Sequence, residues 1–127
     1  MSKKSDKYQK AAANFVATLF HSGTNAHFLH LQSKSYSEHK TLQKYYEDII
    51  GLVDAWAEAY QGRYDVIESY PTDFHIVKTG ALQYIETLSD YVDKIREALP
   101  KETELQQLVD NISELLDTTA YKLRNLK

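Results

Sequence analysis

Apolar residues recur at steps of three and four along most of the chain, the spacing that places them on one face of an α-helix. Such stripes occupy residues 8–33, 36–60, 77–99 and 105–123. Each stripe is long enough for a helix, and the polar residues between its members would face water. The pattern predicts an all-α fold in which four helices pack as a four-helix bundle.

The ends of the second helix carry local signals. Ser35-Tyr-Ser-Glu38 has the form of a capping box, in which Ser35 accepts a hydrogen bond from a free N–H of the first turn. Gly62 is a plausible C-terminal stop. Because only a few residues separate the first two stripes, we expect these two helices to form a tight hairpin.

Residues 63–72 are the longest stretch without periodicity, and Ser69 or Thr72 could cap the third helix. Pro100 should end the third helix and suits the first turn of the fourth. A middle connection that runs the length of the bundle must span about 30 Å, which ten extended residues only just reach.

Composition narrows the class of protein. The 127 residues fit one domain, 1–127, and the formal net charge of −3 gives no general argument for binding nucleic acid. The absence of cysteine excludes disulfides, thiolate metal sites and cysteine nucleophiles. No apolar run approaches a membrane span and no signal peptide is visible, so we expect a cytoplasmic protein, in the host cytoplasm if a virus carries it.

Residues 1–10 contain four lysines and are expected to form a flexible start. These lysines could bind DNA weakly through its phosphates, with an affinity that salt would abolish. The alternative is a solvated end without a partner. No base-reading motif, nucleophile elbow or phosphate loop accompanies them.

Four residues on the first hairpin are typical ligands for non-haem iron: His30, His39, Asp54 and Glu58. Asp54 and Glu58 are one helical turn apart, so one cation could bridge them. His39 and Asp54, however, are fifteen residues apart on one expected helix, which separates them by about 22 Å along the axis. One chain cannot close both pairs around one ion, so a second copy would have to supply half of each site.

Each pair also has an ordinary structural interpretation. Asp54 and Glu58 could simply face water, as most helical carboxylates do. His39 shares a face with Leu42 and Tyr46 and could be a hydrogen-bonded core histidine. A di-iron site within one bundle is not expected, because none of the five histidines has a glutamate three residues before it.

The hairpin resembles that of the Dps group, the ferritin-like mini-ferritins. The resemblance rests on His30-Leu-Gln-Ser-Lys, Glu38-His39-Lys, Tyr46-x-x-Ile49 and Asp54-Ala-Trp-Ala-Glu58-Ala-Tyr, within residues 15–62. It implies a ferritin-like fold, a two-fold dimer with a possible larger shell, and a ferroxidase centre between subunits. Iron would bind there through histidines of one chain and acids of the other, and peroxide or oxygen would oxidise Fe(II).

The resemblance leaves some assignments open. His27 keeps the family's spacing to His39, whereas His30 fits the local pattern better and is preferred. Trp56 could lie near the site or be a core aromatic. Gln43 stands where the family often has an acidic ligand, so a second iron would bind more weakly.

Other departures favour a second function. Ser33-Lys-Ser35 replaces the family's Gly-Pro turn, and Leu31 replaces its usual tryptophan. The pattern also resembles short ferritin-like proteins carried by bacteriophages. The metal could be zinc or another divalent ion, since His/Asp/Glu sites accept several. The alternative is a non-catalytic helical-bundle protein that serves as a structural or interaction component, such as a bacteriophage accessory protein.

Overall fold

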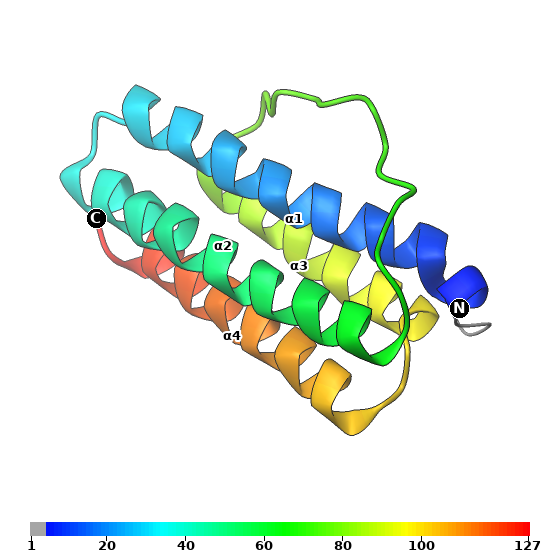
Figure 1. Cartoon of the computed structure of the whole chain (residues 1–127). Helices are drawn as coiled ribbons and strands as arrows, with labels where there is room; N and C mark the ends of the chain where they lie inside the picture. Colours follow the sequence, from blue (N-terminus) through cyan, green and yellow to red (C-terminus); the bar gives the residue numbers. More distant parts are fainter. Residues whose placement is uncertain (1–4) are drawn as a thin grey trace.

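The computed structural model describes residues 5–127 and confirms an all-α chain with four main helices (Figure 1). These are α1 (Ser5–Gln32), α2 (Tyr36–Arg63), α3 (Ala81–Ile95) and α4 (Thr103–Asn125), with the short 3-10 helix η1 (Arg96–Ala98) after α3. The first helix begins three residues before the predicted Tyr8. Residues 1–4, which include Lys3 and Lys4 of the predicted DNA-binding start, lie outside the described residues.

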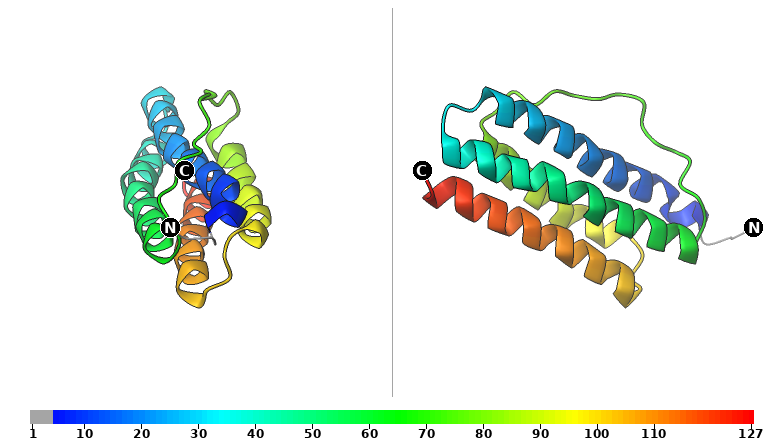
Figure 2. Two further views of the ribbon diagram at one scale, coloured as in Figure 1. Left: turned by 45° about the vertical axis from the view of Figure 1, so that its right-hand side comes forward. Right: turned by 60° about the vertical axis from the view of Figure 1, so that its left-hand side comes forward.

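The helices pack in a ring in which α1 and α4 each lie between α2 and α3 (Figures 1 and 2). The α1–α2 and α3–α4 hairpins are both antiparallel. Helices α2 and α3 run in the same direction, so the segment between them must return along the whole bundle. Every pair of neighbouring helices is therefore antiparallel.

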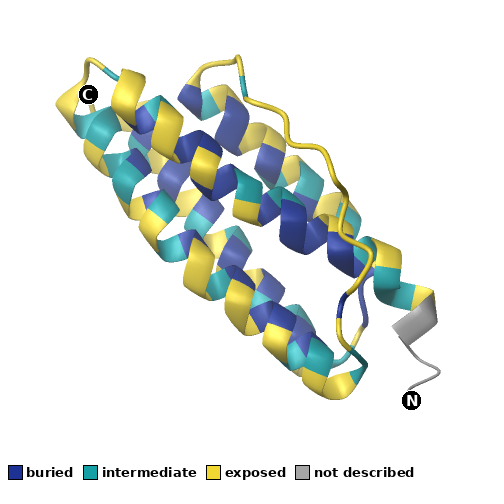
Figure 3. Ribbon diagram, turned by 45° about the horizontal axis from the view of Figure 1, so that its top comes forward, coloured by how far each residue is buried: buried dark blue, intermediate teal, exposed yellow. Residues whose placement is uncertain are grey.

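The predicted stripes form the core. Stretches of buried residues, dark blue on the ribbon of Figure 3, occur on every helix. The fully buried residues include Phe15 and Leu19 from α1, Leu42, Tyr45, Ile49, Val53, Trp56 and Tyr60 from α2, Ile85 and Val92 from α3, and Val109, Ile112 and Leu116 from α4. Burial of this kind contributes about 25 cal/mol for each Å² of apolar surface removed from water. The periodicity thus identifies the correct inner faces.

The prediction for the middle connection was wrong. It runs through residues 64–80 rather than 63–72, and α3 starts at Ala81 with Gly80 as its N-cap, not at Ser69 or Thr72. Val77 belongs to the connection and not to the helix. Seventeen extended residues can reach more than 50 Å, roughly, so the chain has length to spare for a crossover of this bundle.

Two side-chain amides of α1 hold this crossover. Gln9 donates to the carbonyl of Val66 (3.1 Å) and accepts from the N–H of Glu68 (2.7 Å). Asn25 repeats the arrangement, donating to the carbonyl of His75 (3.2 Å) and accepting from the N–H of Val77 (3.2 Å). In extended backbone, the C=O of one residue and the N–H two residues later point to the same side. Each amide therefore binds the crossover as a neighbouring β-strand would, which keeps it extended.

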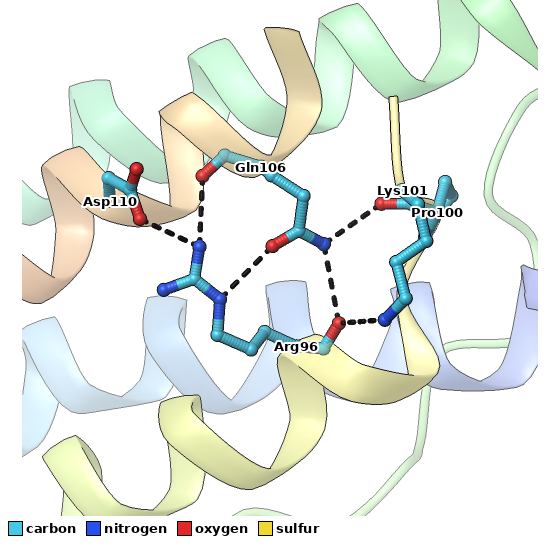
Figure 4. Close-up of polar contacts among 5 residues, drawn as sticks. All are labelled: Arg96, Pro100, Lys101, Gln106 and Asp110. Carbon is cyan, nitrogen blue, oxygen red and sulfur yellow. Dashed lines mark hydrogen bonds and ion pairs between the residues drawn. The ribbon is translucent and has the colours of Figure 1, made fainter. Parts of the chain in front are cut away.

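The α3–α4 turn differs from prediction at Pro100, which precedes α4 instead of opening it. Arg96 donates to the carboxylate of Asp110 (2.7 Å) and to the backbone and side-chain carbonyls of Gln106 (3.2 and 3.0 Å) (Figure 4). The Gln106 amide in turn donates to the carbonyl of Pro100 (2.9 Å). The same amide also donates to the carbonyl of Arg96 (3.3 Å), so it satisfies carbonyl groups that η1 and the turn leave free.

The predicted cap of α2 is confirmed, with one addition. The N–H of Glu38 donates to Ser35 Oγ (3.3 Å), as in a capping box. The Glu38 carboxylate, however, accepts from Ser33 Oγ (2.5 Å), which itself accepts from the N–H of Ser35 (3.2 Å). At the other end, the helix continues past the predicted stop at Gly62 to Arg63. Within residues 5–127, no helix has the length and apolar character that crossing a membrane requires.

Asn25→Ala should lower the free energy of unfolding by about 2 kcal/mol, because the side chain is 4% exposed and its loss leaves buried polar groups without partners. Gln9→Ala is the matched control, since it breaks the equivalent pair of bonds at an exposed position and should cost about 0.5–1 kcal/mol. Urea denaturation measures both. Equal losses for the two variants would contradict the role assigned to the buried clamp.

Candidate functional site

His30 and His39 form a reciprocal pair across the α1–α2 hairpin. The Nδ1 of His30 lies 2.7 Å from the carbonyl oxygen of His39, and the Nδ1 of His39 lies 2.8 Å from the carbonyl oxygen of His30. The two rings stack with their centroids 3.6 Å apart and their planes 19° from parallel. His30 is buried at 7% exposure, and His39 is half-buried.

These bonds decide which ring nitrogen carries the proton. A backbone carbonyl only accepts hydrogen bonds, so both Nδ1 atoms must donate. In the neutral ring, Nε2 then keeps its lone pair. Metal-binding histidines usually donate their second ring nitrogen to a carbonyl or carboxylate in this way, which fixes the ring and its ligating atom. The pair therefore closes the hairpin and leaves two nitrogens able to bind a metal.

His27, the alternative to His30, lies beside the pair but is bound differently. It is exposed and stacks on Tyr46 of α2, with centroids 4.1 Å apart and planes 12° from parallel. Its ring meets that of His30 edge-on at 5.7 Å. Tyr46 also contacts His30 edge-on at 5.2 Å, a supporting role that the sequence pattern did not single out. Only His30 and His39 have Nδ1 fixed by a backbone carbonyl in the α1–α2 turn.

Asp54 and Glu58 form a second pair on the exposed face of α2. A hydrogen bond to Asp54 and the repulsion between the two carboxylates raise the pKa of Glu58 above its ordinary value. A proton or a cation bound between the two carboxylates would therefore relieve their repulsion. The same arrangement is also expected of two acids that simply face water.

One chain does not bring the histidines and the acids together. About 22 Å of helix separates His39 from Asp54. Across residues 5–127, no three His, Asp or Glu side chains are grouped so that they could hold a metal ion. The structure therefore contains two separate pairs of potential ligands.

The two residues expected near the site have other contacts. Trp56 is fully buried and stacks on Tyr60, with centroids 5.2 Å apart. It is two residues from each acid, about 200° around the helix, and therefore faces away from them. Gln43 is half-buried and donates to the carboxylate of Glu47 (3.1 Å).

The outer face of the hairpin carries exposed apolar side chains. Ile50 is 55% exposed, Phe20 36% and Leu31 68%. Ile50 lies between the two pairs, about 20° from His39 and about 40° from Asp54 around the helix axis. The face that holds both pairs is thus partly apolar, which is typical of an interaction surface.

A cavity of about 420 Å³ lies between α1, α3 and the crossover. Its lining includes Asn25, Tyr84, Asp73 and His75, and the last two form an exposed pair 2.8 Å apart. No pattern in the sequence indicates this cavity, because its position depends on where the crossover lies on α1. Most of its polar groups bind each other, as in the bond from Asn25 to Tyr84 Oη (3.1 Å).

Comparison with known proteins gives one family. The model of a family of unknown function, DUF5856, matches residues 30–123, a range that contains His30, His39, Asp54, Glu58 and the crossover. No curated protein and no solved structure matches the chain.

Combining His30→Ala with His39→Ala should show coupling, because either substitution removes the ring stack that needs both side chains, with centroids 3.6 Å apart. The double variant should lose less free energy of unfolding than the sum of the single variants by about 1–2 kcal/mol. His75→Ala is the control and should change stability by no more than about 0.5 kcal/mol, since its side chain is 85% exposed. Additive losses would show that the two rings do not stabilise each other by stacking.

Proposed function

The chain belongs to the DUF5856 family, and we propose that it binds iron at a site shared between two copies. His30 and His39 of one copy would face Asp54 and Glu58 of the other across a two-fold axis. The bound Fe(II) would be oxidised by peroxide or oxygen, as the Dps-like pattern of the hairpin implies. Zinc or another divalent ion could occupy the same ligands.

The reciprocal histidine pair is the observation that carries this proposal. A histidine that serves only to fasten two helices needs one good hydrogen bond, and either ring nitrogen could make it. Here both rings use Nδ1, and both thereby keep Nε2 in the form that binds metal. The same bonds also fix the ring orientation before any metal arrives, which lowers the entropic cost of binding.

The acid pair supplies hard oxygen donors, which the histidine pair lacks. Imidazole nitrogens suit Fe(II), whereas carboxylate oxygens are hard donors that suit the Fe(III) product. A cation between Asp54 and Glu58 would remove the repulsion that raises the pKa of Glu58. Because the residue at the family's further acid position is Gln43, we expect one iron per site rather than two.

A two-fold arrangement of the hairpin would join the two pairs. In a symmetric dimer the same patch of each copy meets the other, so that opposite ends of α2 come together. The exposed Ile50 lies between the two pairs and would be near the axis. The connectivity supports the same proposal, since bundles with one long crossover are typical of ferritin-like proteins.

A non-catalytic interaction protein is the second candidate. Phe28, Leu31 and Ile76 are exposed at 39%, 68% and 60% around a hollow of about 370 Å³ at the end of α1. Such a surface suits a protein partner without any metal. In this second function, the histidine pair serves only to fasten the hairpin, and the purified protein would be a metal-free monomer.

Mixing two inactive variants tests the shared site. His30→Ala/His39→Ala and Asp54→Ala/Glu58→Ala should each lose Fe(II) oxidation as homodimers. After unfolding and refolding together, half of the dimers are mixed and each holds one intact site of two, so about a quarter of the wild-type activity should return. Stopped-flow absorbance of Fe(III) formation measures the rate.

The outcomes separate the two candidates. Unchanged oxidation in the Asp54→Ala/Glu58→Ala homodimer would remove the enzyme claim. Loss of activity without recovery in the mixture would place any site within one chain and contradict the shared arrangement. Refolding each variant alone is the control, and circular dichroism confirms that both have regained helix.

Binding of Zn²⁺, used as a redox-inactive probe, should weaken as the pH falls through the raised pKa of Glu58, because a proton then occupies the acid pair. Glu58→Gln should lose the part of the pH dependence that belongs to this residue, as measured by calorimetric titration of wild type and variant. In the metal-free protein, by contrast, the contribution of Glu58 to the free energy of unfolding should decrease as the pH rises. A raised folded-state pKa contributes stability below the unfolded-state pKa, and this contribution is lost as the pH rises through the folded-state value.

A further inference from the structure

Three aromatic rings, two on α2 and one on its C-cap residue Tyr64, form a continuous stack at this end of the bundle. Trp56, Tyr60 and Tyr64 follow one another at single helical turns. The centroids of Trp56 and Tyr60 are 5.2 Å apart with their planes 14° from parallel, and those of Tyr60 and Tyr64 are 5.1 Å apart at 16°. Most aromatic pairs in proteins meet edge-on or offset at similar distances, and two consecutive near-parallel pairs make an extended π-stack.

The stack ends on a proton acceptor. The hydroxyl of Tyr64 donates to both carboxylate oxygens of Glu102, at 2.6 and 2.8 Å. Glu102 is the N-cap residue of α4, and its side chain is 20% exposed. Burial and the bond to Glu102 raise the pKa of the Tyr64 phenol, so the resting residue keeps its proton.

The two inner members of the stack lack such an acceptor. Trp56 and Tyr60 are both fully buried. Trp56 Nε1 and Tyr60 Oη have no hydrogen-bond partner in the part of the chain that the structure describes. An oxidised phenol or indole becomes a strong acid and is stabilised by losing its proton. Within the stack, the proton acceptor is at Tyr64.

We propose that this stack carries one-electron oxidising equivalents from Trp56 in the core to Tyr64 at the end of the bundle. A one-electron oxidant of the peroxyl- or carbonate-radical class takes an electron from Trp56 through the protein, is reduced to its anion, and leaves the indole radical cation. An electron then passes from Tyr64 through Tyr60 to Trp56, which returns to its resting form, while the phenolic proton of Tyr64 moves to Glu102. The products are a neutral Tyr64 phenoxyl radical and a protonated Glu102.

The position of Tyr64 allows the radical to be repaired. A reductant in solution, of the ascorbate class, can supply one electron, and Glu102 returns the proton to the phenoxyl oxygen. The oxidising equivalent would thus be moved out of the tightly packed core, and no covalent bond in the core would change. This electron transfer needs only the three rings of the stack and Glu102. It does not depend on metal binding at the histidine and acid pairs.

The test uses the single tryptophan of the chain in metal-free protein. A laser pulse at the red edge of tryptophan absorption ionises Trp56, and dissolved oxygen captures the ejected electron as superoxide. Transient absorption should show the tryptophan radical decaying as a tyrosyl radical forms, and electron paramagnetic resonance of frozen samples should detect the tyrosyl species. In Tyr64→Phe, the lifetime of the tryptophan radical should increase about tenfold or more, the change produced by about 1.4 kcal/mol in the barrier.

Tyr8→Phe is the matched control. Tyr8 contacts Tyr64 edge-on at 5.4 Å but lies outside the stack, so its removal should leave both signals unchanged. Glu102→Gln preserves the shape of the acceptor but not its basicity, and should slow formation of the tyrosyl radical. A tryptophan radical that decays at the wild-type rate in Tyr64→Phe would overturn the proposal. An unchanged rate in Glu102→Gln would overturn the assigned path of the proton.

Discussion

The parallel direction of α2 and α3 is the constraint on which the rest of this fold depends. Because of it, the chain must return along the whole bundle between two helices, and residues 5–127 contain no strand that could bind its backbone. Gln9 and Asn25 supply that binding from α1, one near each end of the extended stretch. The crossover then covers part of α1 and of the α1–α3 groove. The face of α2 that carries Asp54 and Glu58 stays exposed.

Side chains fasten each of the three connections, in addition to the few bonds that the turns' own backbone makes. The His30–His39 pair closes the first hairpin, the two amides hold the crossover, and Arg96 with Gln106 closes the second hairpin. In the first case, the fastening bond also sets the tautomer that a metal requires. Stability and ligand geometry are therefore coupled at the histidines, whereas the exposed acids can be changed with little effect on the fold.

The sequence predicted the helices well because their periodicity is a local property. It failed at the start of α3, since Val77 fits a helical stripe as well as it fits an extended strand. What decides its conformation is a bond to Asn25, a residue 52 positions earlier. The ligand-type residues were likewise visible from their spacing. The mutual bonds of His30 and His39 were not, because proximity across a turn does not specify which ring nitrogen meets which carbonyl.

Between its two bound stretches, the crossover makes an arch of exposed residues, 69–74, that contributes no side chain to the buried core. Exposed loop tips of this kind tolerate cleavage and insertion. Each half of the chain on either side of the arch is a complete helical hairpin with its own fastening. The bundle therefore consists of two helical hairpins joined by a linker that can be changed. The arch is the position at which the chain can be split, circularly permuted or labelled.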